Sequence, residues 1–95
     1  MSLMTPAEAA ALHANASANA SANDGYVMWF VTLSDPANPG QAVAWAKKAT
    51  YSGGERLPGE LVADTLYELR TMLPAGLTWH DRTPFDLPNT VEVWE

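Results

Sequence analysis

The chain has 95 residues, of which 47% are hydrophobic, and its 11 acidic and 5 basic side chains give a net charge of −6. This length predicts a single domain, and the negative charge repels phosphate backbones, so we expect no nucleic-acid partner. Cysteine is absent, which excludes a disulfide framework, thiol catalysis and a cysteine-ligated metal site.

The sequence carries no sign of a leader or of a membrane segment. It begins without the basic stretch and the continuous apolar run of a secretory signal. No stretch approaches the roughly 20 apolar residues of a membrane span. We therefore expect a cytoplasmic protein with no membrane partner.

A capping box marks the first helix. Thr5 and Glu8 are spaced to cap each other's backbone groups, and Pro6 suits the first helical position, which predicts a short helix from Pro6 to about His13. Residues 14–23 contain only alanine, asparagine and serine. Because these residues have little to bury, they are predicted to form a linker or a frayed helix.

The segment Tyr26–Leu33 is rich in β-branched and aromatic residues and is bounded by turn residues, which predicts a strand. Alternation divides this strand into two apolar faces, so we expect it to need cover on both sides. The two sets are Val27, Trp29, Val31 and Leu33 on one face, and Tyr26, Met28, Phe30 and Thr32 on the other.

A second strand, Gln41–Tyr51, is predicted after the proline-containing turn Ser34–Gly40. Val43, Trp45 and Tyr51 lie on one of its faces and alternate alanines on the other. Two consecutive lysines, Lys47 and Lys48, interrupt this pattern and predict a bulge or the departure of the strand from the sheet.

Glycines in Ser52–Arg56 predict a hairpin turn, since this segment lacks the spacing and the lysine of a phosphate-binding P-loop. Two interpretations stay open for the main helix that follows. The capping-box match at Thr65–Glu68 favours a start near Asp64, with Glu60–Ala63 as a short strand that leads into the helix. The rival is one longer helix from near Pro58, so residues 58–63 are either strand or helix.

Two further extended segments are predicted near the end of the chain. The first surrounds Trp79, and the second is the strand Thr90–Glu95. Alternation in this strand places Glu92 and Trp94 on one side, so we expect the Trp94 ring, which shares its side with a carboxylate, to be partly exposed.

One patch brings an imidazole, a carboxylate and a guanidinium together: His80, Asp81 and Arg82, the candidate catalytic residues. In an extended segment His80 and Arg82 point away from Asp81, which is poor geometry for a histidine–aspartate pair. His13 and His80 each lack a second histidine at metal-ligand spacing. We therefore expect a protein that is not an enzyme and has no metal site and no cofactor.

The remaining candidate is an interface. The first strand is apolar on both faces while the chain offers one well-specified helix to cover them, so one face is short of cover. Three outcomes stay open: the alanine-rich segment lies across this face, a second copy does, or the aromatic rings fill the core of a monomer. The candidate interface residues are Tyr26, Met28, Phe30, Trp45, Trp79 and Trp94.

A set of short segments, most of them in the last third of the chain, carries a resemblance: Leu61–Leu66, Leu69–Arg70, Met72–Pro74, Gly76–Thr78 and Val91–Trp94. In these segments, and in some of the strand regions before them, the chain resembles small uncharacterised bacterial proteins. This resemblance brings no activity, and implies that Leu61–Ala63 is a strand running into the main helix. The chain is more faintly similar to the HicB-type antitoxin domain, in which a small sheet leads into a helix that opens with an Asp-Thr-Leu-like segment.

These elements together predict an α+β fold: a mainly antiparallel sheet of three or four strands with one main helix on one face, plus a short N-terminal helix. Residues 1–23 form the N-terminal helix and the low-complexity segment, and residues 24–95 a single α+β domain. The predicted function is that of a non-catalytic interaction module, a homo-oligomer such as a homodimer that associates through sheet-face aromatics. The alternatives are a small enzyme or accessory subunit that uses the His80 loop, and an antitoxin-like regulatory domain.

Overall fold

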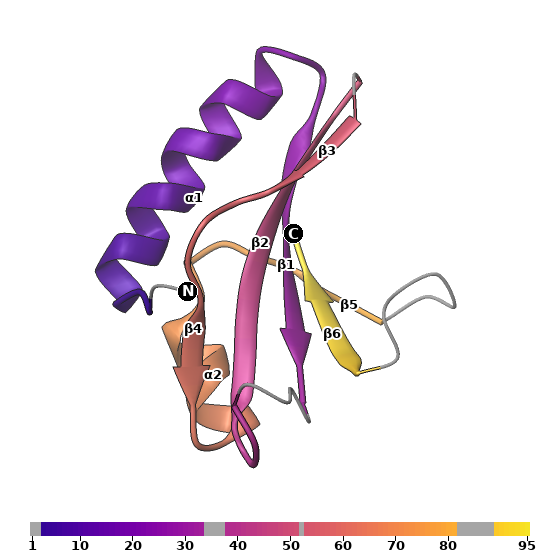
Figure 1. The fold of residues 1–95 in the computed structure, drawn as a ribbon. Helices are drawn as coiled ribbons and strands as arrows, with labels where there is room; N and C mark the ends of the chain where they lie inside the picture. The colour runs from indigo at the N-terminus through magenta and orange to yellow at the C-terminus, as the bar shows by residue number, and fades with distance from the viewer. Residues whose placement is uncertain (1–2, 34–37, 52, 82–88) are drawn as a thin grey trace.

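Six antiparallel strands and two helices make up the fold in a computed structural model, which describes residues 3–33, 38–51, 53–81 and 89–95 (Figure 1). The strand order is β3-β2-β1-β6-β5, and β4 pairs with β2 beside β3. The α+β class and the antiparallel sheet are confirmed, with more strands than the three or four expected. The elements are α1 (Pro6–Ser21), β1 (Tyr26–Thr32), β2 (Ala42–Thr50), β3 (Gly53–Arg56), β4 (Leu61–Ala63), α2 (Leu66–Met72), β5 (Trp79–His80) and β6 (Thr90–Trp94).

The hairpin of β1 and β2 forms the centre of the sheet. The two strands pair in one unbroken register from Tyr26, opposite Ala49, to Thr32, opposite Val43. The prediction that Lys47 and Lys48 break β2 is wrong: both lysines continue the ladder, one on each face of the sheet. The irregularity in this region lies in β6, where the pairing with β1 shifts register by one residue beside Thr90.

The outer strands beside β2 come from the segment after it. The chain reverses between Thr50 and Gly53, which pair directly, so the predicted hairpin is present but its glycines belong to β3. After β4, α2 begins at Leu66, and the Thr65 side chain accepts a hydrogen bond from the Glu68 backbone N–H at 3.1 Å. The strand-then-helix interpretation is therefore confirmed, and the longer helix from Pro58 is wrong.

Helix α1 continues to Ser21, well past the predicted end at His13. Its start is as predicted, because Thr5 and Glu8 form the full capping box. The helix extends because alanine has the highest helix propensity and because its alanines bury against the sheet even though each is small. Ala9, Ala16 and Ala20 are all buried against the sheet.

Both helices pack against the same side of the sheet, and the core lies between them and it (Figure 1). Trp29 at the centre of this core is fully buried. Its neighbours in the adjacent strand β2 are the small residues Ala44 and Ala46, which leave room for the indole and for close approach of α1. The alanine-rich segment thus covers the Trp29 face of β1, and the outcome in which it lies across Tyr26, Met28 and Phe30 is wrong.

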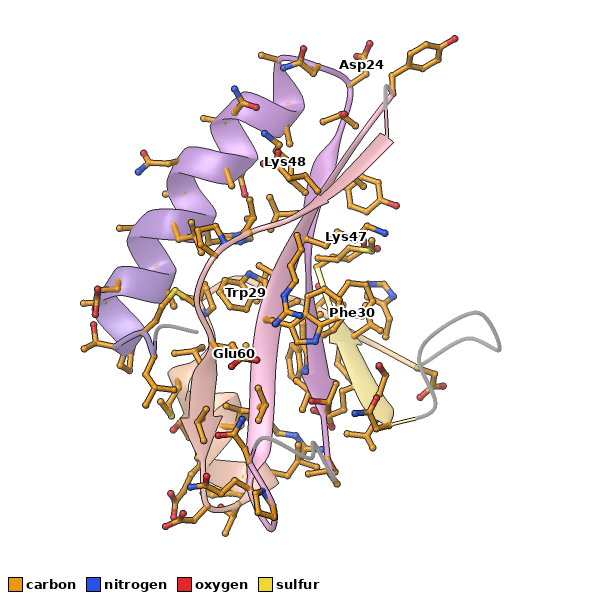
Figure 2. The ribbon with its side chains drawn as sticks, viewed as in Figure 1. Asp24, Trp29, Phe30, Lys47, Lys48 and Glu60 are labelled. Atoms are coloured by element: carbon orange, nitrogen blue, oxygen red, sulfur yellow. The ribbon has the colours of Figure 1, made fainter. Side chains whose placement is uncertain are left out.

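We call the side that carries the helices the covered face and the opposite side the open face, on which no helix of the described residues lies. Figure 2 shows Trp29 and Lys48 on the covered face and Phe30 and Lys47 on the open face. Neither described helix combines the length and apolar character needed to cross a bilayer.

Candidate functional site

Two rows of side chains cross the open face, because laterally paired residues of a sheet point to the same side. In the first row, Arg56 of β3 pairs with Lys47 of β2, which pairs with Met28 of β1. Trp29 pairs with Trp94 in β6, so Glu95 follows one residue later, on the other side of Met28. Glu95 is held there by two backbone hydrogen bonds to Thr78, of 2.7 and 3.0 Å.

The second row is aromatic and lies directly beside the first. Trp45 of β2 pairs with Phe30 of β1, and Phe30 pairs with Val93 of β6. The Phe30 and Trp45 rings stack with their centroids 4.7 Å apart, and the Arg56 guanidinium lies 4.6 Å from the Trp45 centroid. Stacking and cation–π contacts of this kind each contribute roughly 0.5–1.5 kcal/mol. Since β2 lies between β1 and β3, Phe30 and Arg56 approach Trp45 from opposite sides.

Exposure on the open face rises toward the start of β1. Thr32 and Val43 are buried and Phe30 is 9% exposed, whereas Met28 and Trp45 are half-buried and Tyr26 is 52% exposed. The accessible part of this face is therefore the part that carries the charged row. Four of the six predicted interface residues share the open face: Tyr26, Met28, Phe30 and Trp45.

Charges on this face are unequally distributed. Lys47 and Arg56 are directly opposite each other on neighbouring strands, a like-charge pairing that is unfavourable in a sheet. Arg56 is compensated by the buried Glu60 carboxylate, 3.2 Å from its guanidinium. Among the described residues Lys47 makes no ion pair. The Lys47 ammonium group is therefore without a counter-charge in the part of the chain that the structure describes.

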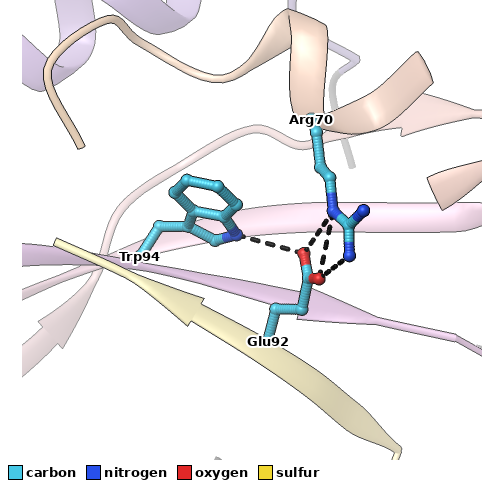
Figure 3. A network of polar contacts seen from close by, with 3 residues as sticks. All are labelled: Arg70, Glu92 and Trp94. Carbon is cyan, nitrogen blue, oxygen red and sulfur yellow. Dashed lines mark hydrogen bonds and ion pairs between the residues drawn. The ribbon is translucent and has the colours of Figure 1, made fainter. Parts of the chain in front are cut away.

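The other two predicted interface residues lie on the covered face. Trp79 pairs with Trp94 there, and the Trp94 indole N–H donates to the Glu92 carboxylate at 3.1 Å (Figure 3). Arg70 of α2 binds the same carboxylate in a bidentate ion pair, and this hydrogen bond to Glu92 raises the pKa of Arg70. Trp94 is half-buried, as predicted, and its indole N–H is bonded to the carboxylate through which Glu92 holds α2 to β6. The six candidates therefore do not form one surface.

Of the three candidate catalytic residues, the structure describes two, His80 and Asp81. His80 lies in β5 and its ring nitrogen is 3.4 Å from the Glu95 carboxylate, whereas Asp81 is exposed beyond the strand. Arg82 lies outside the described residues. No group of three or more metal-ligating side chains occurs within residues 3–33, 38–51, 53–81 and 89–95.

A further polar contact, between His13 and Trp29, has no signal in the sequence. The Trp29 indole N–H donates to His13 Nδ1 at 3.0 Å, and because indole is a donor only, Nδ1 must be unprotonated. The neutral ring therefore carries its hydrogen on Nε2, which lies 3.5 Å from the Ser17 hydroxyl oxygen. Burial lowers the pKa of His13.

This tautomer decides what His13 can do chemically. With hydrogen on Nε2, the imidazole donates toward Ser17 and has no lone pair to take the serine proton, so the two residues are not a nucleophile and its base. They line a groove of about 610 Å³ between α1 and the start of β1, together with Tyr26 and Glu95. The contact between His13 and Ser17 could not be predicted, because the helix expected from the sequence ends at about His13 and does not include Ser17.

Comparison with known proteins returns no match: no family model, no curated protein and no solved structure matches this chain. The resemblance to small uncharacterised bacterial proteins, and the fainter one to the HicB-type antitoxin domain, stay predictions. The functional assignment therefore depends on the geometry of the two faces of the sheet.

Proposed function

We propose that this protein is a non-catalytic interaction module that associates with a second copy of itself through the open face. The observation that carries the proposal is the contrast between the two sides of β1. Its odd-numbered residues are buried in the core between the sheet and the two helices, whereas Tyr26, Met28 and Trp45 on the other side keep exposed aromatic and apolar surface beside Lys47. Aromatic residues with a charged margin are typical of interface centres.

A protein partner fits this surface better than a nucleic acid. Proteins that bind single strands stack bases on free aromatic faces and track the backbone with positive charge. Here the Trp45 ring is occupied by Phe30 on one side and by Arg56 on the other. The net charge of −6 also opposes the approach of phosphates.

The alternatives lack a comparable observation within the described residues. The Glu95 carboxylate could orient the His80 imidazole, but within the described residues no contact joins this pair to a nucleophilic side chain. His13 donates from Nε2 and so does not act as a base toward Ser17. An antitoxin-like role depends on the resemblance alone.

Two exposed tyrosines on different surfaces provide the test. Tyr26 is 52% exposed on the open face and Tyr67 is 75% exposed on α2. We expect the weight-average mass of the wild type in sedimentation equilibrium to rise with concentration above the 10.2 kDa of one chain. The Tyr26→Ser variant should weaken association about tenfold, as loss of an aromatic anchor does, while Tyr67→Ser should match the wild type. A wild type that keeps the mass of one chain at millimolar concentration would contradict the proposal, as would equal effects of the two substitutions.

A further inference from the structure

The charged row is asymmetric about β1. On one side of Met28 lie two cations, Lys47 and then Arg56, and on the other side lies Glu95. Neighbouring strands of a sheet are about 4.8 Å apart. Lys47 and Glu95 therefore lie at about equal distances from β1, on opposite sides of it.

Resting on the proposed self-association, we infer that the two copies are related by a two-fold axis that lies between the facing sheets and runs along β1. Rotation about this axis reverses the order of the strands and keeps each residue at its height along them. It places Lys47 of each copy over Glu95 of the other, and Met28 over Met28. The charged row thereby becomes complementary to itself, with two identical ion pairs on either side of the axis.

The other in-plane orientation of the axis, across the strands, is unfavourable. It would place β2 of one copy over β2 of the other, and Lys47 and Arg56 would face the same cations of the second copy. Like charges brought together at an interface oppose association. The charge pattern therefore selects the axis along β1.

Both members of the proposed ion pair are accessible for it. Lys47 is half-buried and makes no ion pair among the described residues. The Glu95 side chain is 39% exposed, and its described ion-pair partner, His80, is a cation only when protonated. Facing sheets pack about 10 Å apart, a distance that extended lysine and glutamate side chains can bridge together.

The same axis also matches the apolar row. Rotation about β1 places Trp45 over Val93 of the second copy, because these residues lie on the strands to either side of Phe30. Phe30 then lies over its own counterpart. Phe30 and Val93 are buried within one copy, so the half-buried Trp45 supplies the accessible apolar surface of this row beside the ion pairs.

Charge exchange tests the axis. The Lys47→Glu variant alone would place two carboxylates together at both contacts, and Glu95→Lys alone would place two ammonium groups together. We expect each single variant to associate at least about tenfold more weakly than the wild type. An equimolar mixture of the two variants, and the double variant in one chain, should recover wild-type affinity to within about threefold. In the double variant both contacts regain opposite charges about the axis along β1. The mixed dimer pairs carboxylates with ammonium groups about either axis, so its recovery shows that the two charges lie in the interface, and the double variant identifies the axis.

Matched controls change the same charges at positions outside the proposed contact. Lys48→Glu changes the same charge one residue along β2, on the covered face, and Asp81→Lys changes an exposed acid beside His80. Neither should alter association by more than about twofold, and circular dichroism of each variant verifies the fold.

The outcomes separate the two proposals. If the wild type associates but the double variant stays as weak as the single variants, the axis along β1 is wrong while self-association stands. If Lys47→Glu associates more tightly with the wild type than the wild type does with itself, lysines face each other and the axis across the strands is right. A wild type that does not associate overturns both the axis and the proposed function.

Discussion

The two faces of β1 show how one strand with apolar residues on both sides divides its roles. On the covered face, Trp29 is flanked by Ala44 and Ala46 of β2, and these small side chains let an alanine-rich helix approach the sheet. On the open face, the same strand pair carries Trp45 and Lys47, whose large side chains keep such a helix from packing closely on the sheet. The size of the β2 side chains therefore decides which face receives α1 and which is left for another partner.

The largest expected effect comes from exchanging the tryptophans of the two faces for alanine. Trp29→Ala empties a fully buried site beneath α1 and removes the indole donor of His13, so the free energy of unfolding should fall by about 3–5 kcal/mol. Trp45→Ala removes a half-buried ring and should cost roughly half as much. Urea denaturation at a concentration where the protein is monomeric measures both values.

The association of the same two variants sharpens the comparison. Trp45→Ala should weaken self-association, whereas Trp29→Ala, where folded, should not. Equal losses of folding stability, or equal losses of association, would show that the two faces are not distinct in the way proposed.

A smaller effect is expected from the pH dependence of the His13 contact. Because burial lowers the pKa of His13 below 6.5, the unfolded chain binds this proton more readily than the native state does. Stability should therefore be complete above about pH 6.5 and fall as the pH decreases toward the lowered native pKa. Protonation also puts a hydrogen on Nδ1, which then opposes the Trp29 donor.

The His13→Gln variant isolates this contribution. All other ionisable groups are the same in the two proteins, so the difference between their changes in unfolding free energy from about pH 7.5 to about pH 5 reports His13. The wild type should lose more stability on acidification than the variant. Parallel pH profiles would mean that His13 takes up its proton without losing its contact.

Several features could be predicted from sequence because they depend on local patterns. Alternation assigned Trp29 and Phe30 to opposite faces, and the capping residues Thr5 and Thr65 located both helix starts. The end of α1 was missed because a low-complexity alanine run lacks the large apolar residues that indicate burial. Its helix is stabilised by contacts of Ala16 and Ala20 with a distant sheet.

The candidate site was predictable only in part, for a similar reason. Tyr26, Met28, Phe30 and Trp45 share a face for two reasons. Strand alternation can be seen in the sequence, whereas the register between β1 and β2 cannot. That Trp79 and Trp94 lie on the other face depends on the pairing of β6 with β1 and β5, which no local pattern specifies. The position of Glu95 opposite Lys47 across β1 follows from the same long-range pairing.

Thiol cross-linking tests the central claim, that a second copy lies on the open face, most directly. The chain has no cysteine, so single substitutions give one reactive thiol per copy. With a short bifunctional maleimide, Met28→Cys should form a covalent dimer rapidly, because the axis along β1 brings the two thiols together. Asn15→Cys, exposed on α1, should form little. Equal dimer yields from the two positions, or none from Met28→Cys at concentrations where the wild type associates, would contradict the account.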